Sequence, residues 1–474
     1  MTPFFRYQHK AILAALSLSA LAVPLLADQK MTPEKAEEIR KNVKVAEDAL
    51  GRITQSGASP EVQKDAKTAE SALREAAQQL DEYTAHSDQA SSDIYDNGNK
   101  YPAQAGVKIE SFDVPVGSTV VHVPVTLDKA SPNTVIAHVR VFDGQGGSGN
   151  PDATKAVIFR PGDPLTKTVS FDVKGMDEGH NVKAVQSSVP DGGSRLGGGI
   201  LITAKQGAVN EPIPDNGPGP LKFAPVGELC YSVTGKTIQF DDKGGPNTFS
   251  TALAQGRTQV GNGESGYYGP MEMGGFNRTG DDLVLSSRRL AKPVAVGSPV
   301  TLYPFLAAML SGHRTPETQF KYGTVEWVVK MPNRKGSWPA MWLLPTSGWP
   351  PEIDVYEGFG YNGSWKFSSD LSTNLHGGHK SVHKFSRPAM FMKMSTFGLA
   401  DTLDSDFHTF AVTVDAGWIT MFIDGTETMR YANPFQGETW YPLTNVAVKA
   451  NSESAYDDGS GDMVLRSLKI WRAQ

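Results

Sequence analysis

The chain has 474 residues, too many for one ordinary hydrophobic core, so we expect two or three domains. Its 48 glycines and 31 prolines, with 20% charged residues, predict a mainly β protein with many turns. The formal net charge is −6 and no basic stripe with interleaved aromatic residues occurs, which argues against nucleic acid as a partner.

Residues 1–27 have the pattern of a secretory signal peptide. Basic residues between positions 6 and 10 precede an apolar run at 11–23, and cleavage is expected after Ala27. The alternative is an uncleaved anchor, but the apolar run is short for a full span. We therefore expect a secreted or periplasmic protein with no integral membrane span after cleavage. The single cysteine, Cys230, excludes an internal disulfide.

Residues 28–90 predict an α-helical hairpin. Thr32, Pro33 and Glu34 form a favourable helix start, and Gly57 interrupts the pattern before a second start. On both sides of the break, apolar residues recur at alternating spacings of three and four. Because these seams are narrow and rich in alanine, the hairpin alone would be marginal. A spacer, a docking element for a protein partner and a self-association device all remain open.

A polar linker, 91–105, leads into a region of strand-like alternation at 106–205. Valines alternate with polar residues in several short runs separated by turns, which predicts an accessory β-sandwich of about seven strands. This region loosely resembles a Calx-β or immunoglobulin-like module. The prolines and glycines of 206–222 predict a stiff linker without pairing partners.

The catalytic domain is expected at 223–474, where three carboxylates lie within six residues at 352–357 (EIDVYE). The apolar members favour a strand, on which Glu352 and Asp354 share one face. Glu357 joins that face only if one residue is extruded as a bulge. Long side chains leaning inward could then approach the ~5–5.5 Å that a retaining glycosidase needs. The alternative is a solvated acidic face, although crowded carboxylates cost stability and raise pKa values.

The segments before this stretch carry a family resemblance. Residues 323–332 (GTVEWVVKMP), 336–345 (GSWPAMWLLP) and 352–357 together resemble glycoside hydrolase family 16, over roughly residues 225–474. The E-x-D-x-x-E core resembles the bulged branch, with laminarinases and agarases, rather than the E-x-D-x-E branch of lichenases. The resemblance implies a concanavalin-like β-jelly-roll sandwich, which can hold an extended sugar chain across one concave sheet.

The resemblance also implies the roles of the acids. Glu352 would be the nucleophile and Glu357 the general acid and base of a retaining double displacement. Asp354 would lie between them, where its charge can keep the pKa of Glu357 raised while it bonds to Glu352.

Sugars stack on aromatic rings, so a glycan cleft needs exposed Trp or Tyr beside the acids. By the resemblance, Trp338 and Trp342 are the first candidates and Trp440 a weaker one; the alternative for each is a place in the core. His376 is expected to hydrogen-bond within the cleft. Asn262 is expected to contact the substrate, although its glycine-flanked loop reads equally as a plain turn.

No cofactor is expected to be required, and a structural calcium ion is left open. His376, His379 and His383 have the spacing of a zinc-binding helix face, but Gly377 and Gly378 break a helix there. We therefore predict no metal at the site.

The expected function is that of an exported, retaining endo-β-glycanase acting on a polysaccharide, either a β-1,3- or mixed-linkage glucan or a bacterial exopolysaccharide. The alternatives are a transglycosylase with the same residues, a non-catalytic carbohydrate-binding protein and a polysaccharide-assembly factor that docks through its hairpin. The three clustered acids favour an enzyme. Substrate choice does not carry over, because residues 448–451 and 313–314 depart from the family's usual sequences at positions expected to border the cleft.

Overall fold

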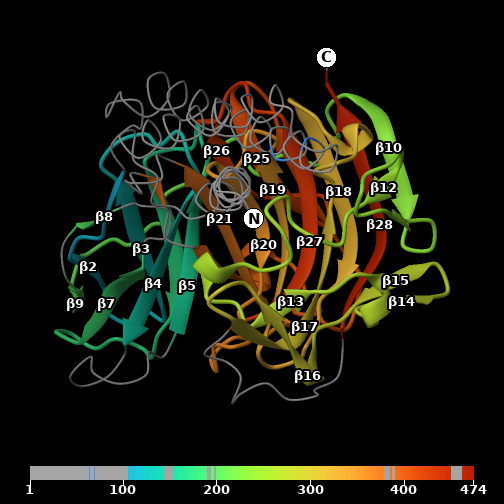
Figure 1. Cartoon of the computed structure of the whole chain (residues 1–474). Helices are drawn as coiled ribbons and strands as arrows, with labels where there is room; N and C mark the ends of the chain where they lie inside the picture. Colours follow the sequence, from blue (N-terminus) through green and yellow to red (C-terminus); the bar gives the residue numbers. More distant parts are fainter. Residues whose placement is uncertain are drawn as a thin grey trace, which may run out of the picture. The chain divides into compact units, whose positions relative to one another are not determined.

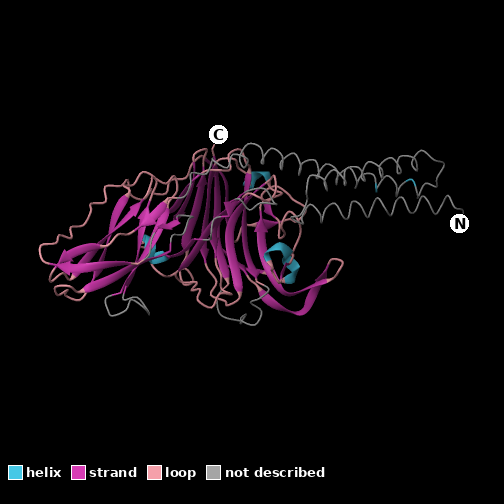
Figure 2. Ribbon diagram, turned by 90° about the vertical axis from the view of Figure 1, so that its left-hand side faces the viewer, coloured by secondary structure: helices cyan, strands magenta, loops and turns pink. Residues whose placement is uncertain are grey.

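The computed structural model describes residues 63, 69, 105–142, 153–188, 194–196, 199–377, 385–386, 390–449 and 462–473. The predicted signal peptide, nearly all of the predicted hairpin 28–90, and His379 and His383 lie outside these residues. Within them, strands dominate and helical segments are short, so the mainly β class is confirmed (Figures 1 and 2). No helix of the described part is long and apolar enough to cross a membrane.

The region 106–205 contains two sheets. The four-stranded sheet has the order β6-β3-β1-β8 and the five-stranded sheet the order β2-β9-β7-β4-β5. Their strands are β1 (Gly106–Lys108), β2 (Phe112–Pro115), β3 (Val120–Leu127), β4 (Val135–Phe142), β5 (Ala153–Phe159), β6 (Thr166–Asp172), β7 (Asn181–Ser188), β8 (Ser194–Leu196) and β9 (Ile200–Lys205).

One hydrophobic core joins these two sheets. Along β3, burial alternates strictly, with Val121, Val123 and Val125 inside and the residues between them only partly covered. These valines belong to the same buried cluster as Val139 of β4 and Ile202 of β9. The alternation seen in the sequence therefore places one face of β3 against the opposite sheet.

The linker 206–222 does have bonding partners, so the prediction of an unpaired linker is wrong. The Asn210 side chain accepts from the His122 backbone N–H at 2.7 Å, and the Ile213 N–H donates to Thr168 at 2.9 Å. At the linker's end, Lys222 forms an isolated β-bridge with Thr426. Proline and glycine disfavour regular ladders, but they leave the other backbone and side-chain groups able to bond.

Two larger sheets make up the region from residue 223 onward. The eight-stranded sheet has the order β14-β15-β28-β18-β24-β25-β26, with β10 also paired to β28. Its strands are β10 (Glu228–Thr234), β14 (Phe276–Thr279), β15 (Asp282–Leu285), β18 (Gly323–Lys330), β24 (His408–Val414), β25 (Trp418–Ile423), β26 (Thr426–Ala432) and β28 (Met463–Arg472).

The nine-stranded sheet has the order β13-β17-β27-β19-β20-β21-β22, with β16 on β17 and β23 on β21. Its strands are β13 (Gly266–Tyr268), β16 (Arg288–Val296), β17 (Thr301–Ser311), β19 (Ser337–Pro345), β20 (Glu352–Glu357), β21 (Asp370–Gly377), β22 (Phe385–Ser386), β23 (Met390–Lys393) and β27 (Trp440–Val448). A small pair, β11 (Gln239–Phe240) and β12 (Thr248–Phe249), and the 3-10 turns η3 (Val260–Asn262), η4 (Met271–Met273), η5 (Pro316–Thr318) and η6 (Met394–Phe397) complete the elements.

The two larger sheets pack face to face, and their contacts define an inner and an outer face for each strand (Figure 1). Across the interface, the Trp327 indole N–H of β18 donates to the Thr444 hydroxyl of β27 at 3.0 Å. The ring of Tyr356 on β20 meets Phe410 of β24 at 5.4 Å between centroids. Side chains alternate along a strand, so Glu357, the neighbour of Tyr356, lies on the outer face.

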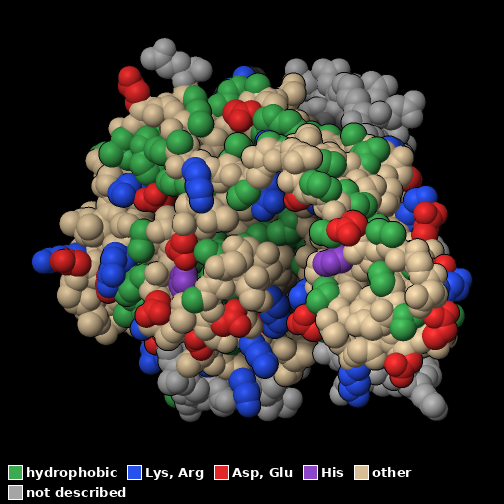
Figure 3. All heavy atoms as spheres, turned by 180° about the vertical axis from the view of Figure 1, so that it is seen from behind, with side chains coloured by type: hydrophobic (Ala, Val, Ile, Leu, Met, Phe, Trp, Pro, Cys, Tyr) green, Lys and Arg blue, Asp and Glu red, His purple; other side chains and the backbone are tan. Residues whose placement is uncertain are grey.

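Charged side chains are mixed on the described surface. Figure 3 shows acidic and basic groups interspersed over one side of the molecule, without a broad field of either sign. This agrees with the modest net charge of −6.

Thr444→Val should destabilise the sandwich, because it leaves the buried Trp327 N–H without an acceptor. We expect the free energy of unfolding to fall by about 1–3 kcal/mol, measured by urea denaturation. In a Trp327→Phe background, the same substitution should have little effect, since no N–H remains to be left unpaired. Equal losses in both backgrounds would show that this hydrogen bond does not hold the sheets together.

Candidate active site

A β-bulge in β20 brings the three predicted acids to one face of the nine-stranded sheet. Asp354 lies opposite Trp342 of β19 and Glu357 opposite Ala340, and the register shifts between these two pairs. Two residues of β20 therefore span one step of β19 around Val355. Without this extra residue, Glu357 would point into the sandwich. The bulge predicted from the acid spacing is thus present.

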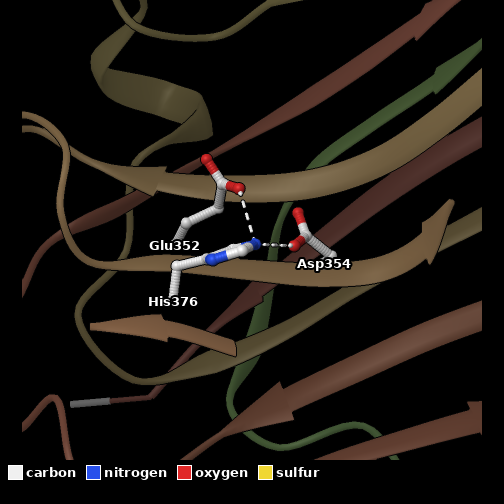
Figure 4. Close-up of side chains that lie close together, drawn as sticks. All are labelled: Glu352, Asp354 and His376. Atoms are coloured by element: carbon white, nitrogen blue, oxygen red, sulfur yellow. Dashed lines mark ion pairs between the residues drawn. The ribbon is translucent and has the colours of Figure 1, made fainter. Parts of the chain in front are cut away.

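The neighbouring strand β21 adds His376 and Asn374 to this face. Their partners on β20 are Glu352 and Asp354, respectively. Figure 4 shows His376 Nε2 directed toward both carboxyls, at 3.5 Å from Glu352 Oε1 and 3.2 Å from Asp354 Oδ2. The Asn374 side-chain nitrogen lies 3.0 Å from the same Nε2. The predicted place of His376 beside the acids is therefore observed.

Glu352 and Asp354 form a coupled acid pair. Burial, followed by the charge of Asp354, raises the pKa of Glu352 well above its ordinary value, and burial also raises the pKa of Asp354. Ionisation of one carboxyl therefore disfavours ionisation of the other, and the ionisation of the pair belongs to both residues.

Glu357 occupies a different environment at the other end of the acidic face. Burial, with repulsion from Asp354, raises the pKa of Glu357 to about 8, while His376, Trp338 and Lys449 act in the opposite direction. The Trp338 indole N–H donates to Glu357 Oε1 at 3.2 Å. A carboxyl in this state holds its proton at neutral pH and can deliver it.

Aromatic side chains line the Glu357 end. Trp338 is half-buried and meets the rings of Phe359 and Tyr361 at 5.7 and 5.8 Å between centroids. Burial, and the charge of Glu357, raise the pKa of Tyr361 to about 12, so its hydroxyl stays protonated. Trp338 and Tyr361 thus offer ring surface beside the acid, as a sugar-binding cleft requires.

Trp342 lies on the acidic face, but only 7% of it is exposed. Its indole N–H donates to Asn445 at 2.6 Å, and the Asn445 amide lies 3.5 Å from the Tyr268 hydroxyl. That hydroxyl in turn donates to Glu264 at 2.8 Å. Trp342 therefore lies beside Asp354 on the acidic face, and its polar partners come from strands far away in sequence.

The prediction for Trp440 is wrong. Trp440 is fully buried against Phe435, so it has no surface to offer a sugar. The neighbouring Tyr441 shares the alternating face of Leu443, which lies opposite Trp342. Burial, followed by the charge of Glu352, raises the pKa of Tyr441 well above its ordinary value. Because side chains alternate along a strand, Tyr441 lies on the face that carries the acids and Trp440 lies on the opposite, buried face.

Asn262 is exposed at the end of η3, in the turn-like loop that its glycines predict. Its side-chain nitrogen lies 3.5 Å from Glu264, and its carbonyl accepts a hydrogen bond from Lys449. Because Lys449 lies over Trp338, this loop borders the Glu357 end. Lys449 was expected to border the cleft as a family departure, but its contacts were not predicted.

The acidic cluster also has the spacing of a metal site. Glu352, Asp354 and His376 each offer a ligand atom within 4.8 Å of the others. A bound cation would need both carboxylates ionised, whereas burial favours the protonated form of the pair. The residues therefore fit an acid–base site better than a cation site.

Comparison with known proteins supplies the family. Residues 283–462 match the profile of glycosyl hydrolases family 16, a span that contains all three acids, both strands that flank them and Lys449. The chain contains a domain of this family. The resemblance seen in the segments before the acids is therefore confirmed at the level of the family. The branch and the identity of the 106–205 module remain predictions.

Curated relatives match over part of their length. An endo-1,3-1,4-beta-glycanase of Rhizobium meliloti (strain 1021) is 28% identical over 182 residues, 37% of this chain and 36% of that protein. A galactan endo-beta-1,3-galactanase of Flammulina velutipes is 27% identical over 149 residues, 31% of this chain and 55% of that protein. The matches thus span about a third to a half of these relatives.

Among solved structures, the catalytic domain of an endo-1,3-beta-glucanase (laminarinase) from Thermotoga petrophila RKU-1 is similar. It shares 22% identity with a TM-score of 0.42, covering 53% of this chain and 100% of that one. The laminarinase from Rhodothermus marinus shares 20% identity with a TM-score of 0.40, covering 53% and 99%.

Glu352→Gln should abolish turnover without unfolding the domain, because the amide keeps the shape of the side chain but cannot attack a sugar. We expect kcat to fall at least about 10³-fold. Thermal denaturation at pH 7 should give a Tm equal to or above that of the wild type, since one buried acid is removed. The exposed Glu272→Gln serves as the matched control. Full activity in Glu352→Gln would rule out the assignment.

Asp354→Asn should move the pH profile of turnover. Its charge raises the pKa of Glu357, so the neutral amide should lower that pKa. A proton donor acts below its pKa; the basic limb of kcat/KM, near pH 8 in the wild type, should therefore shift to lower pH. The optimum value should fall roughly 10- to 100-fold.

The control for this experiment is Asp281→Asn, at an exposed carboxylate paired with Lys236. A basic limb that stays in place in Asp354→Asn would show that Asp354 does not act on Glu357.

Proposed function

We propose that residues 223–474 form the catalytic domain of a retaining endo-β-glycanase. The observation that carries this proposal is the placement of the three acids on one face of β20. Glu352 and Asp354 lie together beside His376, while Glu357 lies apart beside the Trp338 indole N–H and has a pKa raised to about 8. Acids in two such environments suit a nucleophile and a proton donor, respectively.

In the first step, the Glu352 carboxylate attacks the anomeric carbon. A bond forms between this carbon and a Glu352 oxygen, and the bond to the leaving sugar's oxygen breaks. Glu357 donates its proton to that oxygen, so the leaving sugar departs as a neutral alcohol.

In the second step, the now ionised Glu357 takes a proton from water. The water oxygen bonds to the anomeric carbon as the bond to Glu352 breaks, which restores both carboxyls. The indole N–H of Trp338, which donates to Glu357, stabilises the ionised form that exists between the two steps.

A polysaccharide is the substrate that this proposal assigns. Matched relatives are named for β-1,3- and β-1,3-1,4-linked glycans and for a β-1,3-galactan, which favours a β-linked glucan without separating it from other β-1,3 polymers. Trp338 and Tyr361 provide ring surface next to the proton donor for stacking a sugar.

Export is part of the proposal, since residues 1–27 read as a signal peptide. Mass spectrometry of the protein from its producing cell should find an N-terminus at Asp28; an intact N-terminus would refute cleavage.

Release of reducing ends from a panel of β-glucans, galactans and bacterial exopolysaccharides tests the function. At least one polymer should be cleaved by the wild type and left intact by Glu352→Gln. Proton NMR of the first product should show the β-anomer, because two displacements preserve configuration. Initial release of the α-anomer would exclude the retaining mechanism. Lack of cleavage across the panel would count against hydrolysis of these polymers.

A further inference from the structure

Lys449, which follows β27, is held in a built position at the Glu357 end of the site. Its backbone forms an isolated β-bridge with Glu264, and its ammonium group donates to the Asn262 carbonyl. Gly263, which lies between Asn262 and Glu264 in the chain, has φ +64, and a β-carbon there would stand 3.9 Å from Lys449 Nζ. The loop thus turns tightly enough to bring its carbonyl onto the ammonium group.

The ammonium group lies on aromatic rings that lead to the proposed acid. Lys449 Nζ stands 4.8 Å from the centroid of the Trp338 indole and 6.0 Å from that of Tyr361. Both distances lie within the range of a cation–π contact. The same indole donates its N–H to Glu357 Oε1. One connected path therefore runs from the Asn262 carbonyl through Lys449 and Trp338 to Glu357.

We propose that Lys449 is a positioning residue for Glu357: anchored by the 262–264 loop, its ammonium group holds the Trp338 ring so that the indole N–H points at the acid. This inference rests on the proposed function for its catalytic consequence, but the contacts exist independently of any reaction. A tryptophan ring at the edge of a cleft can rotate about two side-chain bonds. A cation on its face favours the orientation seen here.

The charged groups around Glu357 set its pKa, and with it the pH range in which it can donate a proton. From β20, Asp354 and Glu352 repel its carboxylate form; from β21, His376 favours it; from beyond β20, the Tyr361 hydroxyl faces it. Trp338 and Lys449 both lower the pKa of Glu357, against the rise caused by burial. Removing the lysine should therefore raise that pKa, both directly and by releasing the indole.

Lys449→Met is the central test, because it keeps the length and apolar stem of the side chain and removes the charge. We expect kcat and kcat/KM to fall together by roughly three- to tenfold, with KM little changed. The basic limb of the pH profile should move to higher pH. Lys449→Arg, which keeps a cation over the ring, should lie close to the wild type.

The matched control is Lys321→Met. Lys321 is exposed and lies over the Tyr322 ring at 5.6 Å, so the substitution removes a similar cation–π contact away from the acids. It should leave the pH profile unchanged.

A titration that needs no substrate separates this proposal from the proposed function. Carbon-13 labelling of the glutamate carboxyls, with Glu357 assigned from a Glu357→Gln variant, should show a higher pKa for Glu357 in Lys449→Met than in the wild type. An unchanged pKa would overturn the positioning role whatever the activity. A raised pKa in a protein that cleaves no glycan would keep the positioning role and refute the hydrolase.

A double-mutant cycle tests the path through the ring. If Lys449 acts through Trp338, Lys449→Met should have a smaller effect on kcat in a Trp338→Phe background than alone. Fully additive losses would refute that path. A rise in KM alone, with kcat and the pH profile unchanged, would make Lys449 a substrate contact and overturn the proposal.

Discussion

The main physical constraint on this domain is that a single strand, β20, carries three carboxyls on one face. Like charges so close repel one another, and burial adds to the cost of ionising them. They cannot relieve this by moving apart, because β20 is paired on both sides and its inner face is packed against the second sheet through Tyr356 and Phe410. The acids therefore adjust by retaining protons rather than by moving.

The bulge at Val355 divides this acidic face into two parts. On the Glu352 side, a second acid and His376 of β21 lie beside the carboxyl, and burial and the charge of Asp354 raise its pKa. On the Glu357 side, the neighbours include an indole N–H and a lysine, both of which favour the ionised form of the carboxyl. Two glutamates five positions apart on one strand thereby acquire different acid–base behaviour, as a double displacement requires.

The sequence was informative where a property depends on neighbours along the chain. The strand at 352–357, its bulge and the alternating burial of β3 all follow from local spacing and β propensity. Trp440 was misassigned because composition does not say which face a residue takes; only the register with β19 places Tyr441 at the acids and Trp440 in the core. The residues of the linker at 206–222 were expected to be unpaired, but their partners lie on strands that the sequence alone does not bring near.

The hydrogen-bond partners of Trp342 could not be predicted from the sequence for the same reason. Glu264, Tyr268 and Asn445 join Trp342 in one hydrogen-bonded chain only because β13, β17, β27 and β19 are neighbours in one sheet. Lys449 was noticed as a departure from the family pattern, yet its contact with Trp338 joins positions more than one hundred residues apart. The spacing of residues along the chain predicts which side chains share one face of a strand. It does not predict which side chains of different strands come into contact.

Stability and proton donation are linked in this domain through Glu357. Because its pKa is raised to about 8 on folding, the folded state binds a proton that the unfolded chain releases above the ordinary glutamate pKa. The stability contributed by that proton is fully present in acid and is lost as the pH rises toward 8. The capacity of Glu357 to act as an acid is lost over the upper part of the same range. Lys449 and Trp338, by lowering this pKa, reduce the energetic penalty of ionisation and narrow the range in which the acid is protonated. A cation at position 449 thus favours the ionised state needed between the two chemical steps, at the expense of the protonated state needed for the first.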